Sequence, residues 1–226
     1  MNAHLLRCLA SAIIFATPVA AQAGNPDGKI QVKLLGTAVL PDGAITRINT
    51  DLIGLPAGSN TAVNDNFVPT IAIEYFFTPN ISAETICCVT QHDVDGTGPL
   101  AGLRLVDDLL ILPATLTLKY HLTGLGAIKP YVGAGPAWFL MLDYKAGPGA
   151  IAAGAARAKV NHKFGAALQA GVDIAVNDQG LGFTLDAKRY FIRPVANFYT
   201  AAGVEALSTR HKLDPWVLSA GVSYRF

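Results

Sequence analysis

In residues 216–226, the last eleven of the chain, every second residue from Trp216 is apolar, the residues between them from 219 onward are small or polar, and the final residue is aromatic. The apolar set is Trp216, Leu218, Ala220, Val222, Tyr224 and Phe226, with Ser219, Gly221, Ser223 and Arg225 interleaved. Successive side chains of a β-strand point to opposite faces. The pattern therefore predicts a strand with one face against hydrocarbon and the other toward a wetter interior, as in a transmembrane β-barrel.

The first 23 residues have the three parts of a secretory signal peptide. Arg7 supplies the positive charge, residues 9–19 are apolar, and Ala21-Gln22-Ala23 resembles a cleavage site. An N-terminal membrane helix is the alternative, but this apolar stretch is too short, because a spanning helix needs about 20 residues. We expect a signal peptide at residues 1–23 and one barrel domain at residues 24–226.

The composition limits the remaining possibilities. Hydrophobic residues make up 51% of the chain, yet no segment after residue 23 runs for 18 apolar residues without a charge. Helical membrane spans are therefore disfavoured. A net charge of +1 provides no broad basic surface, so we expect no nucleic-acid partner.

The cysteines do not indicate a disulfide framework. Cys8 falls within the predicted signal peptide, and Cys87 and Cys88 are adjacent, so in an extended strand they point to opposite faces. We interpret them as small apolar strand residues rather than redox or metal-binding groups. We expect no cofactor and no metal site.

Short and long connections alternate along the chain. The predicted strands are residues 29–40, 67–77, 81–91, 109–122, 128–142, 161–177, 181–193 and 212–226. The short links are 78–80, 123–127 and 178–180, and the long links are 41–66, 92–108, 143–160 and 194–211. Tight turns at one end and long loops at the other are typical of outer-membrane barrels. The sequence thus predicts an all-β fold, an eight-stranded antiparallel up-and-down transmembrane β-barrel in the cell outer membrane.

Two segments test this assignment. Arg189 falls on the apolar face of its strand, where a charge at the bilayer midplane would cost about 2–4 kcal/mol. We therefore expect it near the outer interface, unless the register slips there. Residues 146–158 are rich in Gly and Ala and fit either a loop or a short helix.

Strand direction gives each inward residue a height in the barrel. The inward charged positions gather in the periplasmic half and form a predicted charged lumen floor: Lys33, Glu74, Glu84, Lys119, His121, Asp173, Asp186, Lys188 and Arg225. Four basic and four acidic groups, besides the histidine, suit a mutually neutralised network. Eight strands leave room for side chains or one small ligand, not for a wide aqueous pore.

The inward positions of the outer half are apolar. They form a predicted apolar lumen that binds small apolar solutes: Leu35, Val39, Val68, Ile86, Ile111, Phe139, Met141, Tyr190, Ile192 and Val217. The alternative is that these side chains simply fill the barrel. Inward Gly133, Gly135, Gly165 and Gly171 favour a cavity, although they also relieve crowding around Tyr131 and the charged side chains.

Motifs throughout the mature chain resemble the OmpW family of small outer-membrane barrels. They are Gln31-Val-Lys-Leu-Leu-Gly36 with Pro41-Asp42, Tyr75-Phe-Phe-Thr-Pro-Asn80, His92-Asp93, Leu112-Pro-Ala-Thr-Leu-Thr-Leu-Lys-Tyr-His121, Lys129-Pro-Tyr-Val-Gly-Ala-Gly135, Gln169-Ala-Gly-Val-Asp173, Asp186-Ala-Lys188 and residues 216–226. Most are weak singly, but their order and spacing are specific.

The resemblance implies an eight-stranded barrel that, like AlkL-type proteins, takes up small hydrophobic molecules and releases them sideways into the bilayer. Pro69, Pro113 or Pro136 would then mark interrupted strand pairing, since proline donates no ladder hydrogen bond. A local bulge is the alternative for each. The Cys87-Cys88 pair and the compact first loop depart from the family pattern and leave the position of the gap open.

Three other functions compete with uptake. Lipid-modifying catalysis needs a nucleophile and base near the outer leaflet. His121 is expected near the periplasmic floor, His92 lies in a predicted loop, and the histidines at 162 and 211 have no evident serine partner, so we expect no enzyme. A packed barrel that stabilises the envelope or displays loops is the second alternative. A soluble lipocalin-like barrel is the third, and it would need polar outward faces.

The expected partners follow from the predicted location. They are outer-membrane lipid and lipopolysaccharide, small hydrophobic solutes, and the outer-membrane assembly machinery, which would read the C-terminal strand through Tyr224 and Phe226.

Overall fold

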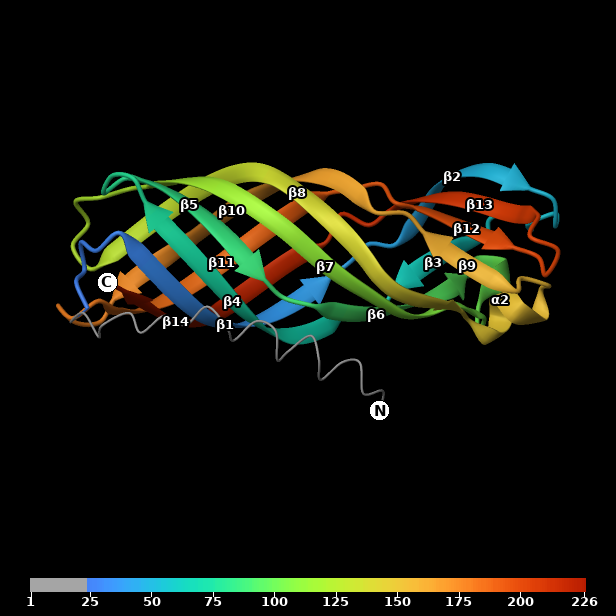
Figure 1. Ribbon diagram of the computed structural model, residues 1–226, viewed down its shortest axis with the longest axis horizontal. Coiled ribbons are helices and arrows are strands. Elements are labelled where there is room, and N and C mark those ends of the chain that lie inside the picture. Colours follow the sequence, from blue (N-terminus) through green and yellow to red (C-terminus); the bar gives the residue numbers. More distant parts are fainter. Residues whose placement is uncertain (1–23) are drawn as a thin grey trace.

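The computed structural model describes residues 24–226, and the predicted signal peptide lies outside the described residues. Eight antiparallel strands form a closed barrel (Figure 1). They are β1 (Ile30–Leu40), β4 (Asn66–Phe76), β5 (Ile81–Cys87), β7 (Arg104–His121), β8 (Ile128–Ala146), β10 (Lys163–Ala175), β11 (Leu181–Phe191) and β14 (Trp216–Arg225). All eight overlap the predicted strands, so the predicted fold is confirmed. No helix within the described range is long and apolar enough to cross a membrane.

Two pairings close the cylinder. The last strand, β14, lies between β11 and the first strand, β1, with which it pairs from Gln31–Arg225 to Leu40–Trp216. On the other side β7 pairs with both β5 and β8. The short turns and the two ends of the described chain lie together at one end of the barrel, which we call the turn end (Figure 1).

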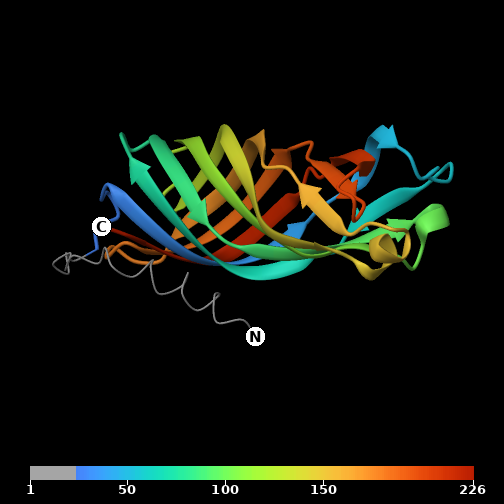
Figure 2. The same ribbon diagram turned by 45° about the vertical axis from the view of Figure 1, so that its right-hand side comes forward.

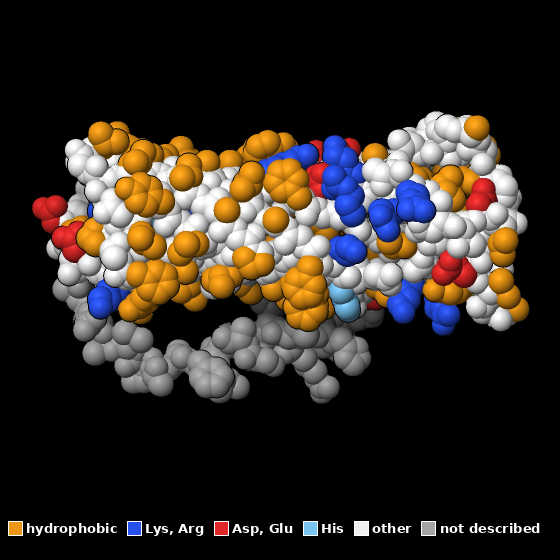
Figure 3. Space-filling model, turned by 90° about the horizontal axis from the view of Figure 1, so that it is seen from above, with side chains coloured by type: hydrophobic (Ala, Val, Ile, Leu, Met, Phe, Trp, Pro, Cys, Tyr) orange, Lys and Arg blue, Asp and Glu red, His pale blue; other side chains and the backbone are white. Residues whose placement is uncertain are grey.

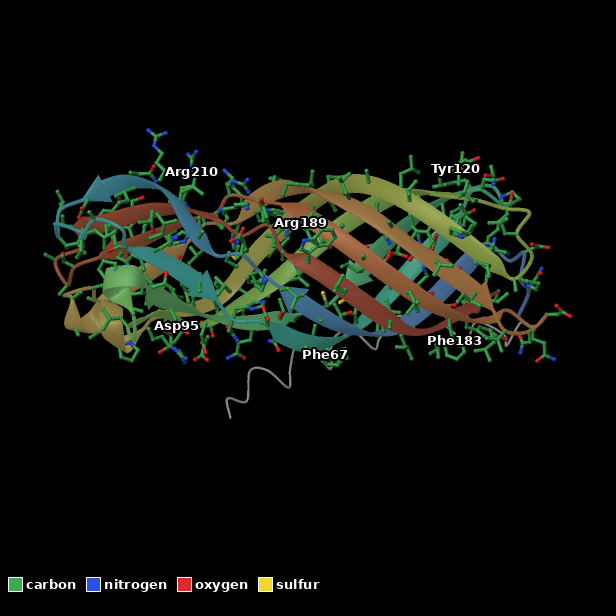
Figure 4. The ribbon with its side chains drawn as sticks, turned by 180° about the vertical axis from the view of Figure 1, so that it is seen from behind. Phe67, Asp95, Tyr120, Phe183, Arg189 and Arg210 are labelled. Atoms are coloured by element: carbon green, nitrogen blue, oxygen red, sulfur yellow. The ribbon has the colours of Figure 1, made fainter. Side chains whose placement is uncertain are left out.

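The period of two seen in the sequence sorts side chains between the wall and the interior. Along β11, Leu185 is 52% exposed whereas Lys188 is 2% exposed. Phe67, Tyr120 and Phe183 point away from the barrel (Figure 4). Hydrophobic side chains cover the visible barrel wall as a broad band (Figure 3). Such a wall suits hydrocarbon, because a closed ladder pairs backbone polar groups between neighbouring strands and leaves no open sheet edge.

The long links differ from the expected loops. They form an extension beyond the barrel, in which β2 (Ala44–Asp51), β13 (Glu205–Lys212), β12 (Val195–Tyr199) and β9 (Arg157–Val160) make a four-stranded sheet. Opposite this sheet, β3 (Asn60–Val63) pairs with β6 (Thr90–Thr97), which joins the upper part of β7 (Figure 2). A 3₁₀ turn at Gly98–Leu100 and α2 (Pro148–Ala152) complete the extension, so the segment at 146–158 contains a short helix.

The extension exists because two hairpin strands are longer than a membrane requires. β7 has 18 residues and β8 has 19, against about 9–11 for a tilted spanning strand. Their upper parts carry the ladder beyond the apolar band. Arg189 lies directly opposite Trp216 at the far end of β11 from the turns, as expected from its charge.

Strand pairing is interrupted beside all three candidate prolines. The β4–β5 ladder stops at Ile71–Cys87, two residues from Pro69. The ladder along β7 stops at Ile86–Thr115 and resumes in the same register at Thr90–Ile111, which leaves Pro113 unpaired on that side. The β7–β8 ladder skips the residues opposite Gly135 and Pro136.

Candidate functional site

The lower half of the lumen holds a dense network of ion pairs with Glu84 at its centre. Glu84 is 2% exposed, and its carboxylate lies 2.9 Å from the ammonium groups of Lys33 and Lys119 and 3.0 Å from that of Lys188. These four side chains come from four different strands, so alternation in each strand is what brings them together. Removing water from so many charges is tolerable only because each ion has close partners of opposite charge.

Glu74 and Asp186 extend the network to either side. Glu74 Oε2 lies 2.7 Å from Lys33 Nζ and 2.8 Å from Lys119 Nζ. Asp186 Oδ1 lies 2.7 Å from Lys188 Nζ, and Asp173 Oδ1 lies 3.4 Å from Lys33 Nζ. The predicted floor residues other than Arg225 thus meet in one cluster, which also includes His121 through Glu74.

Sequence reasoning, which sorted inward residues by charge, missed the uncharged side chains of this network, among them Gln169 and Tyr131. Gln169 donates to Glu84 Oε1 at 2.9 Å and to Asp186 Oδ2 at 2.6 Å, and accepts from Thr117. Tyr131 donates to Asp186 Oδ2 at 2.7 Å, and Lys119 Nζ lies 3.6 Å from the centre of its ring. The only sequence feature that could have identified them is their inward position in the alternation of their strands.

Arg225 differs from the expectation of a mutually neutralised network. Its Nε donates to the Gly28 carbonyl at 2.6 Å, and its guanidinium lies 3.6 Å from the centre of the Phe76 ring. No carboxylate of residues 24–226 lies within 4.0 Å of it. The reason is position: Arg225 is the last residue of β14, at the rim of the turn end, where backbone carbonyls and a ring replace the carboxylates.

A serine, a histidine and a glutamate meet in the floor without forming a catalytic triad. His121 Nε2 lies 2.9 Å from Ser82 Oγ and 2.8 Å from Glu74 Oε1, and Ser82 also donates to Glu74. A triad uses one ring nitrogen for the serine and the other for the acid. Here the same nitrogen faces both groups, and all three side chains are buried at the turn end. No group of three His, Cys, Asp or Glu side chains among residues 24–226 is placed to hold a metal ion.

All ten side chains of the predicted apolar lumen are buried above the floor. Phe139 packs edge-on against Tyr190, with 5.2 Å between ring centres. The space between them is a cavity of about 20 Å³, bounded also by Cys88, Pro113 and Leu213. This volume is close to that of a single water molecule. The upper lumen is therefore apolar and closely packed.

A second and larger apolar cavity lies in the extension. It measures about 50 Å³ and lies between the four-stranded sheet and the upper parts of β6 and β7. Its walls include Val94, Val106, Val160, Phe198 and Leu207. Met141 of the predicted lumen also borders it, and Leu213 borders both cavities. Sequence reasoning missed this cavity because its wall comes from segments that were expected to be loops.

One titratable group borders the upper cavity. His211 contacts Thr209 Oγ1 through Nε2 at 2.8 Å and Thr61 Oγ1 through Nδ1 at 3.1 Å. Burial lowers the pKa of His211, and the hydrogen bond to the Gly43 carbonyl offsets this only in part. Burial also lowers the pKa of His92 on β6. Both rings thus favour the neutral form, which suits an apolar cavity wall.

The lower cavity reaches the place where strand pairing fails. Cys88 and Pro113 border it, and Cys88 and Val89 belong to no strand. Cys88 is 5% exposed, whereas Val89 is 45% exposed on the outer wall. The Cys88-Val89 segment thus lies between the apolar lumen and the outside, with no ladder partner on β4 or on β7.

The sequence profile of the OmpW family matches residues 26–226. An uncharacterized outer-membrane protein, y4mB, of Sinorhizobium fredii is 35% identical over the whole chain and 94% of its own length. The dibenzothiophene metabolism operon protein PahQ of Pseudomonas aeruginosa is 27% identical over 76% of this chain and 77% of its own.

Solved structures share the fold. The outer-membrane protein OprG of Pseudomonas aeruginosa superposes with a TM-score of 0.78 at 26% identity, over 90% of this chain and 98% of its own. AlkL superposes with a TM-score of 0.69 at 22% identity, over 92% and 94%.

Proposed function

This chain belongs to the OmpW family of outer-membrane proteins, and from that membership we propose that it is a conduit for the uptake of small hydrophobic molecules. The turn end then faces the periplasm and the extension faces the outside. An apolar solute enters the cavity of the extension, passes into the upper lumen and is stopped by the charged floor. It leaves through the barrel wall into the bilayer.

The observation that carries the proposal is the stacking of two apolar cavities above a sealed ionic floor. Leu213 borders both cavities, so a solute moves from one to the other by displacing that side chain and Met141. Burial of apolar area is worth about 25 cal/mol per Å², which favours entry of a solute without polar groups. The printed name of PahQ, which refers to dibenzothiophene metabolism, supports an apolar solute class.

The wall at Cys88 and Val89 is the proposed exit. The Pro69 and Pro113 interruptions flank this segment, which therefore has no ladder partner on either side. At the Pro136 gap, by contrast, β8 stays paired with β10 and β7 stays paired with β5. Opening at Cys88 and Val89 breaks no ladder hydrogen bond. Of the three prolines expected to mark interrupted pairing, Pro69 and Pro113 are thus proposed to border the exit, and Pro136 is proposed to mark a local irregularity.

The close packing of the upper lumen favours one alternative. A cavity of about 20 Å³ admits no solute larger than water without rearrangement, and a packed barrel that stabilises the envelope or displays its extension needs none. The two proposals differ in whether apolar substitutions inside the lumen change uptake. Family membership gives no support to a catalytic role, and we propose no enzyme activity.

Two further partners belong to the proposal. Lipopolysaccharide surrounds the outer half of the wall, and the assembly machinery is proposed to read the C-terminal strand with its outward-facing Tyr224 and terminal Phe226. The signal peptide at residues 1–23 is the proposed route of export.

The deciding experiment measures uptake of a small apolar tracer into proteoliposomes that contain the protein. We expect Phe139→Asp with Met141→Asp to reduce uptake to the level of empty liposomes, because two carboxylates make the passage polar. Leu52→Asp with Ile53→Asp, on the exposed tip of the extension, is the matched control and should leave uptake unchanged.

Correct folding is checked by heat-modifiable gel migration. Phe198→Asp with Leu207→Asp alters the cavity of the extension outside the bilayer and provides a second test if the first variant fails to fold. Normal uptake by folded variants of both cavities would leave the packed-barrel alternative.

A further inference from the structure

Six basic side chains lie without acidic partners on one side of the extension and on the barrel below it. We call them the basic strip: Arg47, Arg157, Lys159, Lys163, Arg189 and Arg210. No carboxylate among residues 24–226 lies within 4.0 Å of any of them. All are exposed except Arg189, which is half-buried. Lys and Arg side chains gather where the hydrophobic band meets the extension (Figure 3).

The other side of the extension is different. Arg104 on β7 lies 3.0 Å from Asp93 Oδ2, 3.2 Å from Asp95 Oδ1 and 3.5 Å from Asp107 Oδ1. Lys145 pairs with Asp108 at 2.9 Å. Asp93, Asp95, Asp107 and Asp108 thus pair with cations on the β6–β7 side. Asp42 and Asp214 pair with Lys212 and Arg193, and Glu205 bonds to Thr50 and Tyr199, so none of these three forms an ion pair with the basic strip.

Two arginines of the strip face each other across a strand pair. Arg210 on β13 is the direct register partner of Arg47 on β2, and like charges directly opposite one another destabilise a sheet. Folding of the sheet gains nothing from this arrangement. An external anion would convert the repulsion into a site with two convergent guanidinium groups, which suit phosphate.

The foot of the strip lies on an aromatic surface at the edge of the hydrophobic band. The Arg189 guanidinium lies 5.2 Å from the centre of the Trp216 ring. Lys163 precedes Phe164, which stacks on Trp138 with 5.2 Å between ring centres. Trp216, Phe164 and Trp138 are all exposed. Exposed aromatic rings of this kind mark the membrane interface, so acyl chains lie directly below the strip.

The strip also continues away from the bilayer. Arg189 lies at the interface, and Arg210 lies farther out on β13, within about 20 Å of chain from Trp216 at about 3.3 Å per residue. Figure 4 shows Arg189 over the barrel strands and Arg210 projecting from the extension. A ligand that binds both Arg189 at the interface and Arg210 farther out must carry several negative charges at successive heights above its acyl chains. A phospholipid, with one phosphate at one height, satisfies only the foot.

We propose that the basic strip binds the phosphate groups of lipopolysaccharide, with the lipid A phosphates at Lys163 and Arg189 and the phosphates of the inner core at Arg47 and Arg210. The acyl chains pack on Trp216, Trp138 and Phe164. This site rests on the outer-membrane location of the chain and is independent of whether the barrel conducts solutes. It fixes which side of the barrel holds a bound lipopolysaccharide molecule.

Intrinsic fluorescence provides a direct test, because Trp138 and Trp216 are the two tryptophans of the chain and both lie at the foot of the strip. The purified protein in detergent is titrated with lipopolysaccharide. Arg47→Gln with Arg210→Gln, and separately Lys163→Gln with Arg189→Gln, should each weaken the apparent Kd about 30-fold, at about fivefold for each cation removed near an anionic surface. Arg104→Gln with Lys145→Gln removes two paired cations from the opposite side and should leave the Kd unchanged.

Three results would overturn the proposal. They are equal weakening by the control pair, equal affinity for dephosphorylated lipopolysaccharide, and equal affinity for phosphatidylglycerol, which would assign the strip to anionic lipid in general. Tracer uptake is measured on the same variants. If the strip variants lose lipopolysaccharide binding but retain tracer uptake, the lipopolysaccharide site is supported independently of the conduit proposal. Loss of uptake in the Phe139 and Met141 variants tests only the conduit proposal.

Discussion

At the scale of single residues, Glu84 is the position on which the barrel interior most depends. Three lysine ammonium groups lie within 3.0 Å of its carboxylate, and it also accepts from Gln169. A buried ion pair stabilises little compared with a packed apolar pair, but removing one partner leaves the others uncompensated. Loss of the Glu84 carboxylate is therefore expected to destabilise the whole network.

We predict that Glu84→Gln lowers the free energy of unfolding by about 3–5 kcal/mol, because Lys33, Lys119 and Lys188 lose their shared counter-charge. Urea unfolding of both proteins in liposomes measures this difference in the free energy of unfolding. Asp108→Asn, which removes an exposed pair with Lys145, is the control and should be nearly neutral. Equal stability of the two variants would mean that the floor is hydrated and its charges are screened.

His211 gives the extension a dependence on pH. Its folded-state pKa lies below the unfolded value of about 6.5, so the unfolded segment binds the proton more readily. The stability that the neutral ring contributes is complete above pH 6.5 and is lost as the pH falls through the folded-state pKa.

We therefore predict faster amide hydrogen exchange in β2 and β13 at pH 5 than at pH 7, after correction for intrinsic exchange. His211→Gln should remove the difference in these two strands. The contribution of His92, on β6, should persist in that variant. An unchanged pH difference in His211→Gln would contradict the assignment.

At the scale of elements, the sequence predicted the eight barrel strands because a period of two runs along them, and seven of the eight are long enough to span a membrane; β5 has only seven residues. The charged floor was predicted from the same alternation, because charged side chains at inward positions of neighbouring strands must lie together in the narrow lumen. Pairing itself was not predictable: Gln169 and Tyr131 carry no charge, and their partners lie on other strands.

The extension escaped prediction for a physical reason. Its strands are four to eight residues long, and the ladders carry register shifts at Ser208/Thr209 and Arg210/His211 on β13 and at Phe198/Tyr199 on β12. Each shift resets the alternation, so no segment is long enough to display it. The upper cavity, which these strands enclose, was lost with them.

The break between β5 and β6 can be closed experimentally. Extending the β4–β5 register beyond Ile71–Cys87 places Thr70 opposite Cys88, and both side chains are buried neighbours. In a Cys87→Ser background, Thr70→Cys should form a disulfide with Cys88 and abolish tracer uptake. Reduction should restore uptake.

A staple in an intact ladder is the control for that experiment. Thr37 and Ser219 are register partners on β1 and β14, with 2.8 Å between their hydroxyl oxygens. Cysteines at these two positions, with Cys87 and Cys88 replaced by serine, should cross-link without affecting uptake. Uptake that survives the Cys88 staple would exclude this segment as the exit.

At the scale of the whole molecule, the hydrophobic band defines how the barrel sits in the bilayer. Leu185 and Phe191 lie on the same strand and the same outward face, 52% and 44% exposed, but Leu185 lies near the middle of β11 and Phe191 at its outer end. Arg189 already occupies this face near the outer end.

We predict that Leu185→Arg lowers the free energy of unfolding in liposomes by about 2–4 kcal/mol, while Phe191→Arg costs about 0–1 kcal/mol, since the penalty for a lipid-facing charge falls toward the interface. Guanidinium or urea titration in bilayers of fixed composition compares them. The reverse order would shift the membrane boundary along the barrel by half its height.

The seam between β1 and β14 joins the first and the last strand of the barrel, and Phe226 exchanges backbone hydrogen bonds with Ile30. Without β14, β1 and β11 would each have one unpaired edge, because their other edges pair with β4 and β10. Hydrocarbon does not tolerate an unpaired edge. Loss of β14 is therefore expected to give an open sheet with two unpaired edges rather than a slightly weakened cylinder.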